Sequence, residues 1–252
     1  MLYTERAELI MQQLQLQSTV KVIELSQLLH VSVDTVRRDL KMMEQQGLIK
    51  YVHGGACLPD SFAPFLNFTG REIVSSELKR EAARKALAFI SEGDVIALNS
   101  GTTNTVLAQE LALLEKQITV VTNNYAAINI LLQNRFIRLI AIGGEVDSLE
   151  RSTYGTTCEM ELGCYYPDIA FLSINAVNYA DGFTDFRFHE MGIIQLLAKN
   201  AKKVIAVMDS SKLGKCSQKK VLELEQVDFV AMDEGIPEKI RKKYREKGID
   251  IL

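Results

Sequence analysis

The 252-residue sequence has no tryptophan, and histidine and cysteine are scarce, with three and four residues respectively. The cysteines form no C-x-x-C pair, and no histidine stands at metal-ligand spacing from one of them. We therefore expect free thiols, no metal site and no cofactor. The four cysteines are Cys57, Cys158, Cys164 and Cys216.

Long apolar runs are also absent, since no segment reaches the roughly 18 uncharged apolar residues of a membrane span. The first six residues are charged and polar, unlike a signal peptide. We expect a cytoplasmic protein with no membrane partner. With 47% hydrophobic and 24% charged residues, the chain has the composition of a soluble globular protein, and its length fits one small and one medium domain, or one large domain.

Apolar residues recur at helical spacing in three segments near the N-terminus. The pattern predicts helices over residues 4–15 and 22–29, and a third that runs from the N-cap Ser32 to about residue 46, where Gly47 stops it. Three helices with a tight turn between the second and third have the spacing of a helix-turn-helix.

The third helix has an apolar face and a basic face. At about 100° per residue, Val36, Leu40 and Met43 fall on one side, and the basic residues point away from it. Most basic clusters of this kind are simply solvated helix faces. The formal net charge of −3 does not exclude DNA binding, because a DNA-binding face needs only a local basic patch. The candidate DNA contacts on this helix are Ser32, Asp34, Thr35, Arg37, Arg38 and Lys41.

Residues 48–58 favour the DNA-binding interpretation, because they are typical of two short strands around a glycine turn. A hairpin directly after the third helix is a wing, and it adds His53 and Gly54 to the candidate contacts. The run V-S-x-x-T-x-R-R-D-L at 31–40, together with Glu44 and the H-G-G-A turn at 53–56, resembles the signature of the DeoR family of bacterial repressors. The resemblance implies a winged helix-turn-helix that binds double-stranded operator DNA.

The first 58 residues carry six basic and six acidic residues, so this domain is neutral overall and should bind DNA weakly as a monomer. We therefore expect a homo-oligomer, a dimer or a tetramer. Residues 59–70 contain two prolines and a glycine with little periodicity, which indicates a linker. The expected domains are thus 1–58, which binds DNA, and 71–252, which forms a sensor.

The second domain alternates short apolar strands with helices, which predicts an α/β fold with a mostly parallel sheet covered on both faces. The predicted strands are 95–98, 118–121, 137–142, 169–174, 204–208 and 229–232, and the predicted helices are 76–91, 103–114, 126–132, 190–200 and 237–247. In such sheets, ligands bind at the loops that leave the carboxyl ends of the strands.

Four of these loops are polar and compact. Ser100, Gly101, Thr102 and Thr103 lie between a strand and a helix, where backbone N–H groups and hydroxyls can hold a phosphate. Neither the P-loop nor the G-x-G-x-x-G pattern is present. One such loop alone is usually a plain connection, but four at one edge of a sheet indicate a site. The other three loops supply Asn123 and Asn124, Gly143 and Gly144, and Asp209 with Lys212.

The segment 181–185 and Glu190 form either a further wall of this site or ordinary turns. The S-G-T-T, T-N-N, G-G and D-x-S-K loops again resemble the DeoR family, whose sensor is similar in fold to ribose-5-phosphate isomerase. The resemblance implies a repressor of a sugar-utilisation operon that a phosphorylated sugar relieves. Members of the family usually have an aspartate before the S-G-T-T loop, where this sequence has Asn99, so the resemblance carries no carboxylate role over to this position.

Two other functions are considered. A sugar-phosphate isomerase with an accessory DNA-binding domain could use Asp209, Glu190 and Lys212 as acid–base groups. No carboxylate-rich motif lies on the S-G-T-T loop, so we expect a protein that is not an enzyme. A structural DNA-binding protein with an inert dimerisation domain leaves the polar loops unexplained.

Overall fold

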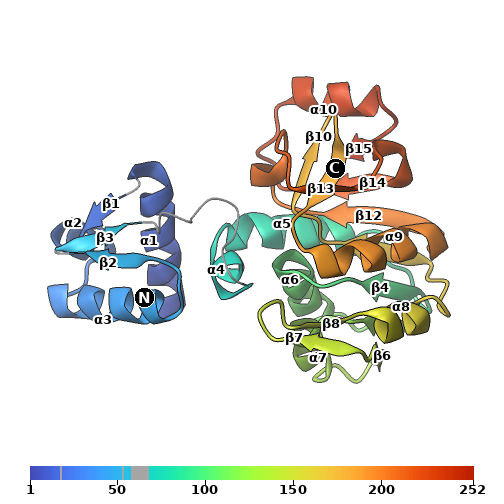
Figure 1. The fold of residues 1–252 in the computed structure, drawn as a ribbon, viewed down its shortest axis with the longest axis horizontal. Coiled ribbons are helices and arrows are strands. Elements are labelled where there is room, and N and C mark those ends of the chain that lie inside the picture. The colour runs from blue at the N-terminus through green and yellow to red at the C-terminus, as the bar shows by residue number, and fades with distance from the viewer. Residues whose placement is uncertain (18, 53, 58–67) are drawn as a thin grey trace. The chain divides into compact units, whose positions relative to one another are not determined.

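A computed structural model describes residues 1–17, 19–52, 54–57 and 68–252, and it divides into two compact units (Figure 1). The units are Met1–Ser76 and Glu77–Leu252. The division falls a few residues beyond the expected domain start at residue 71, because α4 (Phe68–Ile73) belongs to the first unit. Ile73 and Val74 pack against the hydrophobic core of that unit.

The first unit is a winged helix-turn-helix. The two strands of the wing pair as an antiparallel hairpin, and a third strand joins that hairpin in the sheet order β1-β3-β2. The helix bounds agree with the sequence pattern within two residues, whereas the three-residue strand β1 was not predicted. The elements are α1 (Tyr3–Gln17), β1 (Thr19–Lys21), α2 (Val22–Leu29), α3 (Val33–Gln45), β2 (Lys50–Val52) and β3 (Gly55–Cys57).

Both ends of the helix-turn-helix turn are made by local hydrogen bonds. His30 ends α2 in the left-handed region, at φ 53°, and Ser32 begins α3 by accepting a hydrogen bond from the Thr35 N–H at 3.2 Å. At the other end of α3, Gly47 adopts φ 71°, and the N–H of Leu48 donates to the Met43 carbonyl at 2.9 Å. This pair of caps fixes the length of α3.

An ion pair joins α1 to α3. The Arg6 guanidinium donates to both carboxylate oxygens of Asp39, at 2.6 and 3.0 Å, and the Asp39 side chain is only 4% exposed. Asp39→Asn should lower the free energy of unfolding by about 2 kcal/mol, because it removes a charge-assisted pair at a buried position. Urea unfolding checks this.

The matched control for that variant is Asp34→Asn, which removes an exposed pair with Arg37 on the same helix. Its effect should stay below about 1 kcal/mol. Equal losses of stability in the two variants would show that the Arg6–Asp39 pair does not hold α1 to α3.

The second unit is built on a seven-stranded parallel sheet (Figure 1). The chain leaves β4 for two strands on one side and then returns to β9 on its other side, so the order reverses between β4 and β9. Ligands bind at such a switch point, outside the carboxyl ends of the strands. The sheet order is β15 (Asp250–Ile251), β14 (Phe229–Ala231), β12 (Lys203–Val207), β9 (Ile169–Leu172), β4 (Val95–Leu98), β5 (Ile118–Thr122) and β6 (Ile137–Ala141).

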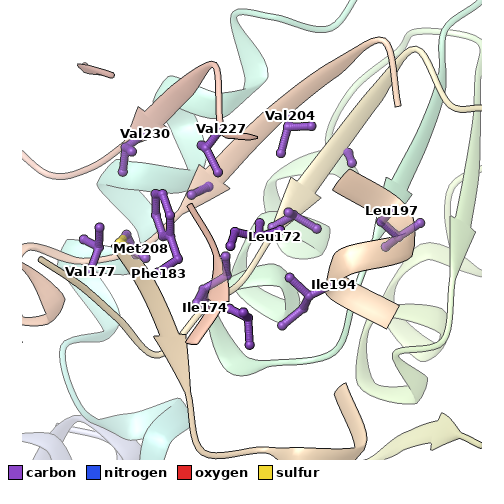
Figure 2. Close-up of a cluster of buried hydrophobic side chains, with 14 of the residues drawn as sticks. Leu172, Ile174, Val177, Phe183, Ile194, Leu197, Val204, Met208, Val227 and Val230 are labelled. Atoms are coloured by element: carbon purple, nitrogen blue, oxygen red, sulfur yellow. The ribbon is translucent and has the colours of Figure 1, made fainter. Parts of the chain in front are cut away.

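Helices cover both faces of this sheet, as the apolar strands predict. Alternate strand residues face opposite sides, so that Ile96 and Leu98 join one core and Ala97 joins the other. The second core includes Phe183 and the apolar side of α9 (Figure 2). The helices of the first core are α5 (Ser76–Leu87), α6 (Thr102–Leu111) and α7 (Tyr125–Leu131), and those of the second are α8 (Thr156–Leu162), α9 (Met191–Asn200) and α10 (Glu238–Arg245).

Several short elements of this unit were not predicted from the sequence. A hairpin follows β6, and a three-stranded antiparallel sheet contains residues 182–185, which sequence patterns left as either a turn or a ligand wall. These are β7 (Glu145–Asp147), β8 (Ser152–Tyr154), β10 (Ala176–Asn178), β11 (Gly182–Asp185), β13 (Lys219–Leu222) and the 3-10 turns η1 (Phe188–Glu190), η2 (Ser210–Lys212) and η3 (Leu224–Gln226).

Within the described residues, no helix combines the length and apolar character needed to cross a bilayer. The same residues hold no group of three or more His, Cys, Asp or Glu side chains placed to bind a metal ion. The four cysteines are free thiols, of which Cys158 is buried and Cys164 and Cys216 are exposed.

Candidate functional site

The exposed face of α3 carries most of the predicted DNA contacts. Val36, Leu40 and Met43 are fully buried, as the helix arithmetic predicts, while Arg37 and Arg38 are exposed. Lys41, Asp34 and Ser32 are exposed too, and Thr35 is half-buried. The Ser32 side chain caps the helix, and Asp34 accepts a hydrogen bond from Arg37 at 3.2 Å. Arg38 and Lys41 have no ion pair within the described part of the chain.

The wing follows α3 directly and is tied to it. The Tyr51 N–H donates to Glu44 Oε1 at 2.7 Å, which fixes β2 against the helix. Gly54 turns the hairpin at φ 79°, a backbone conformation that glycine adopts without strain. Gly55 lies against the Val20 carbonyl so closely that no side chain fits. His53, a predicted contact, lies outside the described residues.

In the second unit, the S-G-T-T loop joins β4 to α6 at the switch point. Gly101 is the N-cap of α6 at φ 125°, and a Cβ there would lie 2.5 Å from Ser173 Oγ and 2.8 Å from an Arg187 nitrogen. Only glycine fits this position. The N–H groups of Gly101, Thr102 and Thr103 donate to no acceptor among the described residues, although all three residues are buried.

N–H groups at a helix N-terminus that lack an acceptor can bind an anion. The Ser100 N–H is not one of these groups, because it donates to Glu190 Oε2 at 3.3 Å. The hydroxyl of Ser100 lies 3.3 Å from a guanidinium nitrogen of Arg187. Ser100 therefore offers a ligand its hydroxyl but not its amide.

The T-N-N loop contacts the S-G-T-T loop. Asn124 Nδ2 donates to the Gly101 carbonyl at 3.3 Å, and its Oδ1 accepts from Ala127 N and so caps α7. The side chain of Asn124 is thus occupied in joining two loops. Asn123 donates to Glu190 Oε1 and to the Thr153 carbonyl, both at 2.8 Å, and its own Oδ1 is buried without a partner in the described structure.

Beneath these loops lies Arg187, a buried residue that the sequence pattern did not single out, whereas Asp185 and Glu190 were among the residues expected to form either a wall of the site or ordinary turns. Arg187 makes a bidentate pair with Asp185, at 3.0 and 2.7 Å. Its remaining N–H groups donate to the Ser100 and Ser173 carbonyls, at 2.9 and 2.8 Å, and to Ser100 Oγ. All five N–H donors are engaged, so Arg187 holds the backbone of the S-G-T-T loop in place and has no N–H group left for a ligand.

The three charged groups differ in their pKa shifts. Burial opposes ionisation of Asp185, but the adjacent Arg187 charge and its hydrogen bonds outweigh it and hold the pKa of Asp185 below its usual value. Burial likewise disfavours the charged form of Arg187, yet Asp185 raises its pKa. Burial raises the pKa of Glu190, against the opposing effects of Arg187 and of hydrogen bonds from Ser100 and Asn123.

The G-G loop follows β6 and packs against the β7–β8 hairpin. The Gly143 N–H donates to Glu161 at 3.1 Å, and a Cβ on Gly144 would lie 2.6 Å from the Tyr154 carbonyl. Thr153 connects this loop to the T-N-N loop, because its hydroxyl donates to the Ile142 carbonyl while its own carbonyl accepts from Asn123. Gly144 therefore packs against β8 of the hairpin, whereas Gly143 is held by Glu161 of α8.

Asp209 and Lys212 lie at the end of β12, two strands from β4. Asp209 Oδ1 accepts from the N–H and the hydroxyl of Ser211, whereas Oδ2 is buried without a partner in the described residues. At about 4.8 Å per strand, Asp209 is roughly 10 Å from the S-G-T-T loop measured across the sheet. A ligand that contacts both loops would have to span this distance.

The chain combines a winged helix-turn-helix with an α/β unit that has a buried polar site at its switch point. This combination defines the class of DNA-binding regulators that carry a sensor domain. Residues 6–62 match the model of the DeoR-like helix-turn-helix domain, and residues 74–234 match that of the DeoR C-terminal sensor domain. The chain belongs to the DeoR family of transcriptional regulators.

Relatives are similar over nearly their whole length. The HTH-type transcriptional regulator GolR of Listeria innocua is 32% identical over 98% of this chain and 97% of its own. The HTH-type transcriptional repressor GlcR of Bacillus subtilis is 30% identical, over 91% and 88%. The glycerol-3-phosphate regulon repressor of Escherichia coli is 28% identical over 98% of both chains. These relatives regulate transcription and are not enzymes, as expected for this chain.

A partial likeness to solved structures includes ribose 5-phosphate isomerase A from Methanocaldococcus jannaschii. It covers 55% of this chain and 54% of the isomerase, with 21% identity and a TM-score of 0.41. At this level the likeness concerns the fold and assigns no activity.

Proposed function

We propose that this regulator represses a sugar-utilisation operon and leaves its operator when a phosphorylated sugar binds in the α/β unit. The observation that carries the proposal is that donors without acceptors and acceptors without donors lie at the same edge of the sheet. Buried N–H donors at Gly101, Thr102 and Thr103 lack acceptors, and buried oxygens of Asn123 and Asp209 lack donors within the described chain. A phosphate accepts hydrogen bonds, and sugar hydroxyls donate them.

The phosphate is placed at the N-terminus of α6, with Lys212 as a mobile counter-charge. Asn123 Oδ1 and Asp209 Oδ2 then accept hydrogen bonds from sugar hydroxyls, while Asn124 and the Gly143–Gly144 loop keep the surrounding loops in place. One relative supports the ligand class, since it is named for the glycerol-3-phosphate regulon. To act as an inducer, the ligand must have a higher affinity for the form of the protein that cannot bind DNA. A ligand with equal affinity for both forms would leave the equilibrium between them unchanged.

We further propose that the protein acts as a dimer or a larger homo-oligomer on repeated half-sites. The basic residues of the DNA-binding unit are balanced by acidic ones, so a single copy makes few phosphate contacts. Light scattering at micromolar concentration should show an oligomer. A monomer that binds a single half-site tightly would contradict this proposal.

The test of the effector site is the double variant Thr102→Val, Lys212→Ala. It removes a hydroxyl and a charge, and it should raise the ligand concentration needed for DNA release by roughly 100-fold or more. A thermal-shift screen of phosphorylated sugars, each beside its unphosphorylated form, first identifies the ligand, because a ligand bound only by the folded state raises the melting temperature. Release is then followed by fluorescence anisotropy of DNA selected by the protein from a random pool.

The matched control is Thr157→Val with Lys215→Ala, which changes the same residue types at exposed positions outside the site. Both proteins should bind operator DNA as the parent does. If the Thr102 and Lys212 variant still releases DNA at the parental ligand concentration, the phosphate site lies elsewhere.

A further inference from the structure

A cavity of about 590 Å³ lies beside α10, apart from the residues of the proposed effector site. It is bounded by the turn after β10, by η2 and by the segment that leads into α10. Its volume falls in the range of about 300–1,000 Å³ that is typical of small-molecule sites. The residues that matter to its chemistry are Tyr179, Ser210, Leu213, Ile240, Lys243 and Tyr244.

The walls of this α10 cavity are mainly apolar and aromatic. Tyr244 is only 4% exposed, and its ring meets that of Tyr179 edge-on with the ring centres 6.2 Å apart. Leu213 and Ile236 line the wall with them, and Ile240 stays 37% exposed although it is a large apolar side chain. An apolar concavity of this kind favours a ligand with an apolar body.

The charge at the cavity is positive. The Lys243 ammonium lies 4.4 Å from the centre of the Tyr179 ring, and that of Lys247, just beyond the end of α10, lies 5.0 Å from it. Neither lysine has an ion pair within the described ranges, and no carboxylate lines the cavity. Asn178 is no counter-group, because its amide donates to Asp181 and to the Lys215 carbonyl and its Oδ1 accepts two backbone N–H bonds.

We propose that the α10 cavity is a second ligand site, which takes a small organic monoanion with a flat apolar body, of the aryl carboxylate class. The carboxylate pairs with Lys243, and the body packs against Ile240, Ile236 and the edge of Tyr244. A sugar phosphate fits poorly, because its hydroxyls would meet apolar walls and lose hydrogen bonds to water. The site is thereby distinct in chemistry from the effector site.

The two sites share one turn of the chain. Ser210 and Leu213 line the cavity; Ser210 is the first residue of the turn η2, which also carries Lys212, and Leu213 follows that turn. Asp209 immediately precedes this turn, and the Ser210 N–H donates to Asp233 at 2.6 Å. A ligand in the α10 cavity therefore contacts the segment that presents two residues of the proposed effector site. Binding in the cavity itself does not depend on that proposal.

The test uses the full chain labelled with 3-fluorotyrosine and followed by fluorine NMR, with Tyr179→Phe and Tyr244→Phe to assign the two resonances. The probes are benzoate and its neutral analogue benzamide, without any sugar phosphate. Benzoate should shift these two resonances saturably and should bind roughly tenfold more tightly than benzamide, because only benzoate pairs with the lysine.

Lys243→Met keeps the apolar stem of the side chain and should weaken benzoate binding to the level of benzamide. Lys239→Met changes an exposed lysine on the same helix outside the cavity and should leave binding unchanged. Absence of a saturable shift at millimolar benzoate, equal affinity for the two probes, or full affinity in Lys243→Met would each overturn the proposal. Shifts that follow protein concentration instead of benzoate would overturn it too, by showing that a second copy of the chain covers the cavity.

Discussion

Asp185→Ala is expected to lower the free energy of unfolding of the α/β unit by about 3–5 kcal/mol, because it leaves the buried Arg187 guanidinium without its counter-charge. The Arg187 side chain is 5% exposed and that of Asp185 is fully buried, so water cannot replace the lost carboxylate. Urea unfolding of the full chain, followed at the transition of the larger unit, measures the loss.

The control is Lys202→Ala, which breaks the Lys202–Asp168 pair, where the lysine side chain is 75% exposed. That variant should lose less than about 1 kcal/mol. Asp185→Ala should also weaken binding of the proposed effector, since Arg187 holds the Ser100 carbonyl in place. A variant as stable as Lys202→Ala would show that the Arg187–Asp185 pair is not a structural element of the site.

The same pair gives a pH dependence with a definite sign. The pKa of Asp185 is lowered in the folded protein, so its stabilising contribution is present above the unfolded value of about 3.9 and is lost as the pH falls through the folded pKa. The stability difference between the parent and Asp185→Ala should therefore shrink in that acidic range. Glu190 acts in the opposite direction, because its pKa is raised and its protonation on acidification favours the folded state.

The parallel sheet and its polar edge could be predicted because short stretches of consecutive residues determine both. Strands such as Val95–Leu98 are short apolar runs between helical patterns, and the carboxyl-end rule then places Gly101 and Asn123 at one edge. Asn124 shows the limit of that rule. A strand end followed by a helix fits an N-cap as well as a ligand contact, and its side chain caps α7.

Arg187 was missed because the loop backbone that it holds lies far from it in sequence, although its ion-pair partner Asp185 is only two residues away. Arg187 reaches Ser100 across 87 positions, and Asn99 reaches Ser173 across 74. The structure also gives a physical reason why this sequence has Asn99 where the family usually has an aspartate. Its amide nitrogen donates to Glu190 Oε2 at 3.3 Å, where an aspartate would place a second negative charge against a buried carboxylate. No local pattern contains this relation.

Replacing Arg37 and Arg38 together with alanine should weaken operator binding by several kcal/mol, at roughly 1–3 kcal/mol for each base contact, and leave the melting temperature nearly unchanged. Both side chains are exposed on α3, whereas Val36 and Leu40 are buried, so the folded unit loses little packing. The pair between Arg37 and Asp34 is exposed at both ends and adds little stability. Fluorescence anisotropy with operator and scrambled DNA measures the effect.

Lys21→Ala is the control, because Lys21 is a well-exposed basic residue of the same unit on β1, outside α3. It should change operator affinity by no more than the loss of one phosphate contact, and the slope of log affinity against log salt by about 1 or less. A loss that is equal on operator and scrambled DNA would show that Arg37 and Arg38 contact phosphates instead of bases. Full operator affinity in the double variant would mean that α3 is not the recognition helix.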